Sequence, residues 1–370
     1  MLKKNLKLLH IFPELGIGGT EKVILQISKF LIDNNDNNKV NIAICSSDGI
    51  SREQFMEAGL KIYQIPKFKK KYSLLSNLFN LSKSIQDFNP DVIHTHSLYS
   101  LVLIYFLKKI KIHNASIIHT GHGGPRKNYD KVAAYISALA DKYITISEHS
   151  YKYLKSKVNH QKLCLIKNGV DYPSSEELYI NTKSLNKNDV LNLAYVGRLT
   201  IQKGLLVLID AIEELIKKGI KVNLKIIGDG ELKKYLENEV MKKGLQDNIF
   251  FLGYKPNPWI EVKEIPIIVM PSLWEPGGLV ALEAIVRNHT VVVSNIDGLK
   301  DAIRDGENGY TFNVGDYKQL AKILLNIYEG QKPLIFLDEE SKKKYYFNFS
   351  TGPKYESIYN KLLKDRDCIR

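Results

Sequence analysis

Cysteine is scarce in this sequence, and long apolar runs are missing from it. The three cysteines, Cys45, Cys164 and Cys368, form no pair with metal-site or redox spacing, and an odd count argues against a disulfide framework. The longest apolar stretch, residues 98–107, is too short to span a bilayer. These shortages argue against a disulfide-stabilised secreted scaffold and a transmembrane protein, and they fit a reducing, cytoplasmic setting.

Signatures of export and of nucleic-acid binding are also missing. The N-terminal apolar run, residues 6–12, is interrupted by Lys7 and His10, and no cleavage-like site follows it, so we expect no signal peptide. No basic recognition helix, zinc-finger spacing or aromatic–basic RNA signature is present. We therefore expect a cytoplasmic protein without a nucleic-acid partner.

Positive charge is abundant and unevenly distributed. Residues 1–180 hold 25 Lys and Arg against 15 Asp and Glu, whereas the remainder holds 28 against 25. A basic N-terminal half favours phosphate-containing ligands or an anionic membrane surface. The run Lys67, Lys69, Lys70 and Lys71 is the expected contact for anionic lipid, and a solvated loop is the alternative. Peripheral association with the inner face of the cell membrane is thus one expectation.

The pattern along the chain predicts two α/β domains. At 370 residues the chain is too long for one ordinary core. Strand-like apolar runs alternate with helical spacing, which is typical of a doubly wound sheet. We expect Rossmann-like domains at 1–173 and 190–345, a polar linker at 174–189, and a C-terminal helix within 346–370 that can cross back to the first domain.

Three segments carry the chemistry. The first is a glycine turn, Gly16-Ile17-Gly18-Gly19-Thr20-Glu21, between the first strand and the first helix. Glycines allow a ligand close to the backbone, and the helix N-terminus offers free N–H groups to an anion. The dinucleotide pattern G-x-G-x-x-G is not met, so a tight turn capped by Thr20 remains an equal alternative.

The second segment follows the first strand of the second domain, where Arg198 and Lys203 flank a loop. Ligands of open α/β sheets bind at the carboxyl ends of strands, and two cations there suit a diphosphate. Two solvated surface cations are the plain alternative.

The third segment is Pro271-Ser272-Leu273-Trp274-Glu275-Pro276-Gly277-Gly278-Leu279-Val280-Ala281-Leu282-Glu283-Ala284. A strand enters a loop, and two glycines then open a helix. The freed N–H groups suit a phosphate, and a carboxylate can accept hydrogen bonds from sugar hydroxyls. Acidic residues at an ordinary solvent-facing helix start are the alternative.

The chain resembles the GT4 family of retaining glycosyltransferases, which have the GT-B fold. The third segment is similar to that family's E-x7-E segment. Further matches are the segments G-G-T-E, H-T-G-H-G at 119–123, N-G-V-D at 168–171, V-G-R-L with K-G at 196–204, and G-D-G at 228–230. Together they follow the family's order from residue 16 to about residue 310.

The resemblance implies a role for each matching residue. Binding of the donor diphosphate is implied for Arg198 and Lys203, and binding of the ribose for Glu283. Glu275 would stand beside the donor sugar, and His122 near the reacting sugar, with His119 as its rival at the same strand end. The remaining donor-binding positions are the N–H groups of the helix start and the N-terminal glycines, namely Gly278, Leu279, Val280, Gly18 and Gly19.

Two features depart from the family or stand outside it. Pro276 replaces the usual glycine after the first glutamate, and it removes one N–H donor from the loop. His94 and His96 alternate along a strand end, but no third ligand has a suitable sequence spacing, so we expect packing or hydrogen bonding and not metal binding. We expect no cofactor and no metal.

The resulting hypothesis is a GT-B glycosyltransferase acting in the synthesis of a bacterial surface polysaccharide, such as lipopolysaccharide or capsule. It would move a sugar from a nucleoside-diphosphate donor, UDP before GDP, to a glycan or lipid-linked acceptor held by the first domain. A non-hydrolysing sugar-nucleotide epimerase of the same fold and a non-catalytic nucleotide-sugar binder are the alternatives. The incomplete glycine pattern argues against a Rossmann oxidoreductase.

Overall fold

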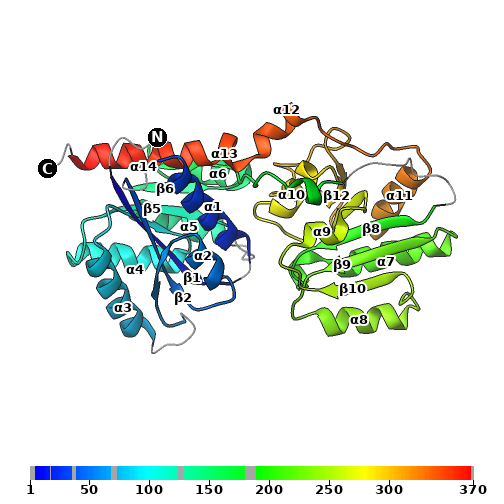
Figure 1. The fold of residues 1–370 in the computed structure, drawn as a ribbon, viewed down its shortest axis with the longest axis horizontal. Coiled ribbons are helices and arrows are strands. Elements are labelled where there is room, and N and C mark those ends of the chain that lie inside the picture. Colours follow the sequence, from blue (N-terminus) through cyan, green and yellow to red (C-terminus); the bar gives the residue numbers. More distant parts are fainter. Residues whose placement is uncertain are drawn as a thin grey trace. The chain divides into compact units, whose positions relative to one another are not determined.

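A computed structural model describes residues 5–16, 18–35, 39–67, 73–123, 128–179 and 189–367. The chain divides into two compact units (Figure 1), which are Met1–Gly169 together with Phe347–Arg370, and Val170–Tyr346. The sequence therefore leaves the first unit once and returns to it at its end.

The first unit is built on a parallel sheet of seven strands in the order β3-β2-β1-β4-β5-β6-β7. The strands are β1 (Leu6–Glu14), β2 (Val40–Ser47), β3 (Lys61–Gln64), β4 (Val92–Thr95), β5 (Ser116–Gly121), β6 (Lys142–Thr145) and β7 (Leu163–Leu165). Strands β4 and β5 are buried along their whole length. Such continuous burial is expected of parallel strands that helices cover on both faces.

The helices of the first unit occupy the connections between these strands and the end of the chain (Figure 1). They are α1 (Gly19–Asp33), α2 (Arg52–Glu57), α3 (Ser73–Phe88), α4 (Leu98–Lys109), α5 (Tyr129–Ile136), α6 (Glu148–Lys155), α13 (Phe347–Ser350) and α14 (Gly352–Asp367). Serine side chains begin two of them, because the Ser97 and Ser147 hydroxyls accept bonds from the N–H groups of Ser100 and Ser150.

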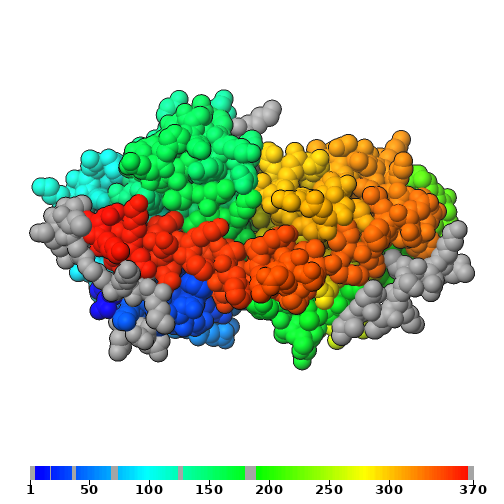
Figure 2. All heavy atoms as spheres, turned by 90° about the horizontal axis from the view of Figure 1, so that it is seen from above, coloured from blue at the N-terminus to red at the C-terminus, as the bar shows by residue number. Residues whose placement is uncertain are grey.

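The C-terminal helix α14 completes one face of the first sheet. It packs beside α1, and Tyr355 and Tyr359 on it are buried to 1% exposure or less. Figure 2 shows this red C-terminal segment lying against blue N-terminal residues. The close packing leaves no room at Gly352, where a Cβ atom would lie 2.6 Å from the ring of Phe30.

The second unit repeats the same plan with six parallel strands in the order β10-β9-β8-β11-β12-β13. These are β8 (Leu191–Val196), β9 (Val222–Ile227), β10 (Ile249–Gly253), β11 (Ile267–Met270), β12 (Thr290–Ser294) and β13 (Tyr310–Phe312). Its helices are α7 (Leu205–Lys217), α8 (Lys233–Lys242), α9 (Pro258–Val262), α10 (Leu279–Val286), α11 (Tyr317–Tyr328) and α12 (Glu339–Lys342).

Alternating residues of β8 divide the second core between the two faces of its sheet. Leu193 and Tyr195 belong to a cluster with residues of α7, α8 and α11. Ala194 and Val196 belong to another cluster, with residues of α9 and α10. This period of two is the signature of a strand covered on both sides.

Residues 174–179 of the expected linker pack on the second unit. The Glu177 carboxylate accepts a bond from the Arg287 guanidinium at 2.7 Å and another from the Asn257 amide at 2.7 Å. The backbone N–H of Tyr179 donates to the Arg287 carbonyl at 2.9 Å. Residues 180–188 lie outside the described residues.

The cysteines and the apolar helices bear on two expectations from the sequence. Cys45 lies buried in β2 and Cys164 partly buried in β7, and both are free thiols, while Cys368 lies outside the described residues. Burial raises the pKa of the Cys45 thiol to about 12. Among the described helices, none combines the length and the apolar character needed to cross a bilayer.

The packing of α14 gives a first prediction. Gly352→Ala should lower the free energy of unfolding by about 1–3 kcal/mol, because the added methyl group would overlap the Phe30 ring, which Phe347 also contacts. Urea unfolding followed by circular dichroism measures the change. Lys354→Ala, an exposed position on the same helix, is the control and should change stability by no more than about 0.5 kcal/mol. Equal stability of both variants would show that α14 is not held by this contact.

Candidate active site

In both units the strand order reverses at one point, between β1 and β4 in the first and between β8 and β11 in the second. Open α/β sheets bind ligands outside the carboxyl ends of the strands at such a reversal. The residues predicted from the sequence lie at or near these two edges.

In the second unit, the loops after β8 and β11 are bonded directly to each other. The N–H of Leu273 donates to the Gln202 carbonyl at 2.8 Å, and the Gln202 amide donates to the Trp274 carbonyl at 3.1 Å. Gly204 adopts φ +61°, and a Cβ atom there would lie 2.2 Å from the Pro271 carbonyl oxygen. A glycine is therefore required where the two loops touch.

This contact brings Lys203 and Glu275 together. The Lys203 ammonium donates to the Glu275 carboxylate at 2.5 Å, and each side chain is 12% exposed. The Ser272 hydroxyl lies 3.4 Å from the same carboxylate oxygen. An ammonium group has three N–H donors, so Lys203 keeps two for a further anion while it holds Glu275.

Two more glycines lie at backbone contacts between loops. Gly298, after β12, contacts the Glu275 loop, and Gly228, after β9, contacts the loop after β8. A Cβ atom at Gly298 would lie 1.7 Å from the Glu275 carbonyl oxygen, and one at Gly228 would lie 1.9 Å from the Gly197 carbonyl oxygen. Four loops after β8, β9, β11 and β12 thus meet through their main chains. Backbone contact of this kind leaves little freedom in the position of Glu275.

Helix α10 begins at this edge. Gly278 is its N-cap with φ +57°, and the helix runs from Leu279. The first N–H groups of a helix have no acceptor within it, so those of Gly278, Leu279 and Val280 are suited to an anion. Glu283 lies on the second turn and is 6% exposed.

Arg198 differs from the other charged residues of this edge. Its side chain is exposed in the loop after β8, and its carbonyl oxygen accepts a bond from the Tyr195 hydroxyl at 2.9 Å. The described residues provide it with no ion pair within 4.0 Å. Its guanidinium is therefore a solvent-facing cation in the same loop as Lys203.

In the first unit, the glycine turn surrounds a carboxylate. Gly18 is the N-cap of α1 in an extended conformation, and Gly19 is the first residue of the helix. A Cβ atom at Gly18 would lie 2.8 Å from a Glu21 carboxylate oxygen, and one at Gly16 would lie 3.2 Å from the other. Glu21 therefore adds a negative charge where the sequence predicted an anion-binding turn. Ile17 lies outside the described residues.

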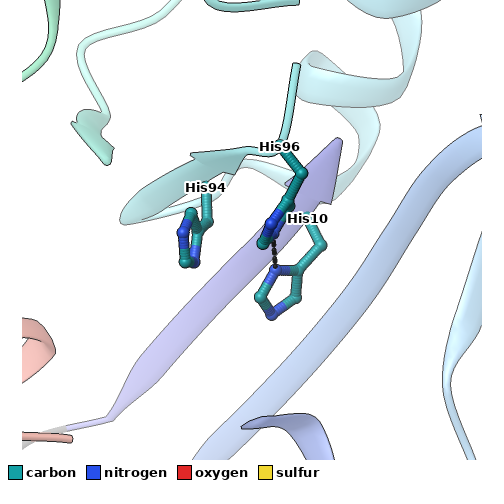
Figure 3. A group of neighbouring side chains, drawn as sticks. All are labelled: His10, His94 and His96. Carbon is teal, nitrogen blue, oxygen red and sulfur yellow. Dashed lines mark hydrogen bonds between the residues drawn. The ribbon is translucent and has the colours of Figure 1, made fainter. Parts of the chain in front are cut away.

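Histidines gather at the strand reversal of the first unit (Figure 3). His10 on β1 lies opposite His94 on β4 in the sheet register, and His96 follows directly after β4. Potential ligand atoms of these three side chains lie within 4.8 Å of one another. His10 is the third neighbour that sequence spacing did not reveal.

Hydrogen bonds already engage five of the six nitrogens of these three rings. The His10 Nδ1 atom lies 2.9 Å from His96 Nε2, and His96 Nδ1 lies 2.9 Å from His122 Nε2. His94 contacts the hydroxyls of Tyr359 and Thr120, each at 2.8 Å. The expected hydrogen-bonding role of His94 and His96 agrees with these contacts.

The two rival histidines of β5 have different surroundings. His119 is fully buried inside the strand, where its Nδ1 atom lies 2.9 Å from the Thr95 hydroxyl. His122 lies just beyond the strand and is partly exposed. Only His122 is therefore placed to touch a ligand without movement of the strand.

Burial lowers the pKa of every histidine in this group. The pKa falls to about 3 for His10 and His119 and to about 4 for His122, because the charged ring would lose its hydration. His94 and His96 have pKa values well below the usual range, first from burial and then from the neighbouring histidines. All five rings are neutral at pH 7.

Comparison with known proteins agrees with this geometry. Residues 179–344 match the family described as glycosyl transferases group 1, and residues 17–172 match glycosyltransferase family 4. An uncharacterized glycosyltransferase of Methanocaldococcus jannaschii is 32% identical over 301 residues, covering 77% of this chain and 80% of that protein. The chain belongs to glycosyltransferase family 4.

Two further comparisons extend over almost the whole glycosyltransferase. The UDP-Gal:alpha-D-GlcNAc-diphosphoundecaprenol alpha-1,3-galactosyltransferase of Escherichia coli is 25% identical, with 96% of each chain covered. The crystal structure of Anabaena HepE in complex with UDP and glucose aligns with a TM-score of 0.78 and 18% identity, covering 96% of this chain and 99% of that one. The fold of this glycosyltransferase is GT-B.

The buried histidines of the glycosyltransferase predict how its stability depends on pH. A ring with a folded pKa of about 3 and an unfolded pKa near 6.5 takes up a proton on unfolding between these values. Stability is therefore full above about pH 6.5 and falls as the pH decreases. His119→Asn should reduce this slope by about 1.4 kcal/mol per pH unit between pH 6 and pH 4.

Urea unfolding at several pH values measures the slope. His160→Asn is the matched control, because His160 is exposed and should leave the slope unchanged. A slope in the His119 variant equal to that of the parent would mean that this ring is already protonated in the folded state.

Proposed function

We propose that this glycosyltransferase takes its sugar from a nucleoside-diphosphate donor bound at the carboxyl edge of the second sheet. The supporting observation is the meeting of Lys203, Glu275 and the N-terminus of α10 at the β8/β11 reversal. Arg198, in the same loop as Lys203, adds a solvent-facing cation.

The charges at this edge match the demands of the reaction. When the bond between sugar and diphosphate breaks, negative charge grows on the departing phosphate. Arg198, the two remaining N–H donors of Lys203 and the first N–H groups of α10 are positive groups that stabilise it. Glu275, held by Lys203, presents its second oxygen as an acceptor for a sugar hydroxyl. Glu283 is the proposed contact of the nucleotide ribose.

The finer assignments remain part of the proposal. UDP is the proposed nucleotide, since the Escherichia coli relative is named for UDP-Gal and Anabaena HepE was solved with UDP. The proposed acceptor is lipid-linked, since the same relative acts on a diphosphoundecaprenol substrate, and the pathway is surface polysaccharide synthesis. We further propose retention of configuration, a reaction without metal, and His122 as the catalytic histidine beside the reacting sugar.

Product analysis distinguishes the proposed transferase from the alternatives. Incubation with a UDP-sugar and an undecaprenyl-diphosphate glycan should give UDP and an extended lipid. The H1–H2 coupling in the product's NMR spectrum should show the same anomeric configuration as in the donor. Inversion at C2 of the donor sugar would identify an epimerase, and no turnover with tight binding would identify a binder. Activity should persist in a chelator.

The donor site gives a quantitative prediction. Arg198→Ala and Glu283→Gln should each weaken UDP binding about 10–100-fold, because each loses a hydrogen bond to or from a charged group. Calorimetry with UDP and UDP-sugars measures the affinities. Glu283→Gln keeps the shape of a side chain that is only 6% exposed, so folding should be preserved.

Arg304→Ala is the matched control, because Arg304 is 78% exposed and pairs with Glu307 on the surface of the same unit. This variant should bind UDP like the parent. Unchanged affinity in both site variants would overturn the assignment of the donor site.

We also propose that the first unit meets an anionic membrane through helix α4. The exposed residues Tyr99, Val102, Phe106 and Ile110 follow the i, i+3 and i+4 spacing of one helix face and are 41–51% exposed. Lys109 and Lys111 lie exposed at its end. An apolar stripe beside cations is the composition of a helix that lies on a membrane surface.

Of the basic run named in the sequence, only Lys67 lies within the described residues. Lys67 is exposed, but its ammonium lies 2.5 Å from a Glu14 carboxylate oxygen, which balances its charge. Lys69, Lys70 and Lys71 lie outside the described residues. The proposal therefore rests on the α4 stripe.

Vesicle sedimentation tests the α4 stripe. The double variant Val102→Glu/Phe106→Glu should partition about ten-fold less onto vesicles with anionic lipid, because apolar contact is lost and like charge is added. High salt should weaken binding of the parent. The control Val314→Glu/Phe250→Glu changes equally exposed residues of the second unit and should bind like the parent. Equal sedimentation of all three proteins would refute the membrane contact.

A further inference from the structure

A single file of three imidazole rings leads from the core of the first unit to its surface. His10 is fully buried, His96 is 6% exposed, and His122 is the partly exposed member at the end of β5. The contacts are His10 Nδ1 to His96 Nε2 and His96 Nδ1 to His122 Nε2, both 2.9 Å. Figure 3 shows the first of these contacts between β1 and the end of β4.

Each contact in this file requires one proton between two nitrogens. A neutral imidazole carries one N–H and one bare nitrogen, so it donates on one side and accepts on the other. Burial keeps these rings neutral, which is reflected in their low pKa values. Both hydrogen bonds must therefore run the same way from donor to acceptor. They run either outward, from His10 toward His122, or inward, from His122 toward His10.

The inner end of the file distinguishes the two directions. His10 Nε2 is buried and has no hydrogen-bond partner among the described residues. If the donors point inward, this nitrogen carries a buried N–H without an acceptor. If they point outward, it is a bare nitrogen. Orphaned buried N–H groups are rarer in proteins than under-used acceptors, so the outward direction has the lower free energy.

We propose that His10 and His96 are positioning residues that hold His122 in the tautomer with its proton on Nδ1. In this arrangement His10 Nδ1–H donates to His96, and His96 Nδ1–H donates to His122 Nε2. His122 then presents Nδ1–H as a hydrogen-bond donor at the partly exposed end of the file. A ligand that His122 meets there must offer an acceptor, such as a sugar hydroxyl oxygen or a phosphate oxygen.

A metal ion is the competing explanation for His10, His94 and His96. It would have to displace at least one bond in each of two rings, because both nitrogens of His94 and both of His96 are already engaged. Only His10 Nε2 is available without such a loss. The hydrogen-bonded file uses the same atoms without breaking any of these contacts.

The contact of His122 with a donor sugar rests on the proposed function, whereas its tautomer does not. Long-range proton–nitrogen NMR of the full chain, labelled with ¹⁵N-histidine, reports which ring nitrogen carries the proton. The nine histidines are assigned by single substitution. We expect Nδ1–H in His10, His96 and His122 of the ligand-free protein.

Two substitutions at His10 form a matched pair. His10→Phe keeps a ring but removes the donor, whereas His10→Asn places an amide N–H near the position of Nδ1. In the Phe variant, His122 should populate both tautomers, and in the Asn variant it should return to Nδ1–H. Thermal unfolding checks that both variants fold, and the spectra are compared only at temperatures where they do.

Transfer kinetics give the second readout. The kcat should fall in proportion to the remaining fraction of the Nδ1–H tautomer: about two-fold for an even mixture, and about 10²–10³-fold for complete inversion, the loss seen when one transition-state donor is removed. The KM for the donor should stay within about two-fold. A structural role alone would not make kcat follow the tautomer fraction across the Phe and Asn variants.

Three results would overturn the proposal. The first is Nε2–H in His122 of the parent protein. The second is a His10→Phe variant with the parent's tautomer. The third is a stoichiometric metal in the purified protein whose removal shifts the His10, His94 and His96 signals. Failure of UDP binding with the expected tautomers would instead count against the proposed function and leave the file of rings intact.

Discussion

The reversal of strand order in each parallel sheet is the constraint on which the rest of the structure depends. Parallel strands send all their carboxyl ends to one edge, and the loops on either side of the reversal turn in opposite directions, which leaves space between them. In the second unit this edge holds Lys203 and Glu275, and in the first it holds His10 and His96. The same topology thus supplies a charged site in one unit and a neutral one in the other, because the neighbouring side chains differ.

The two edges are made rigid by different means. In the second unit, glycines such as Gly228 and Gly298 let loop backbones touch, so the loops hold one another through main-chain atoms. A side chain at these positions would push the loops apart. In the first unit, side-chain hydrogen bonds between buried rings and hydroxyls do the equivalent work. Both nitrogens of His94 and both of His96 are engaged, whereas His10 and His119 each keep one nitrogen without a partner among the described residues. Such buried networks are stable only when nearly every member has a partner.

Much of the fold could be predicted from the sequence, because continuous apolar runs mark buried parallel strands. The apolar runs at 92–95, 191–196, 222–227 and 267–270 predict four strands, and β4, β8, β9 and β11 have these bounds. Strands β7 and β13 were missed, since three residues are too few to show a pattern. Short motifs likewise located the loops of the second unit, because the residues of a motif are neighbours in the sequence. The partnership of His10 with His96 spans 86 positions and that of His94 with Tyr359 spans 265, and no local spacing predicts either. The one available signal was His10, a polar residue between the apolar residues Leu9 and Ile11 of β1.

The bond from Tyr359 to His94 also bears on how the chain folds as it is synthesised. The sheet of the first unit is complete by residue 165, but one of its faces receives Tyr355 and Tyr359 only when helix α14 emerges. All of the second unit is translated in between, and domains usually fold in the order of their synthesis. While the second unit folds, the first unit therefore stays incomplete, and His94 lacks its partner Tyr359. The unit that is synthesised first is thus the last to be completed.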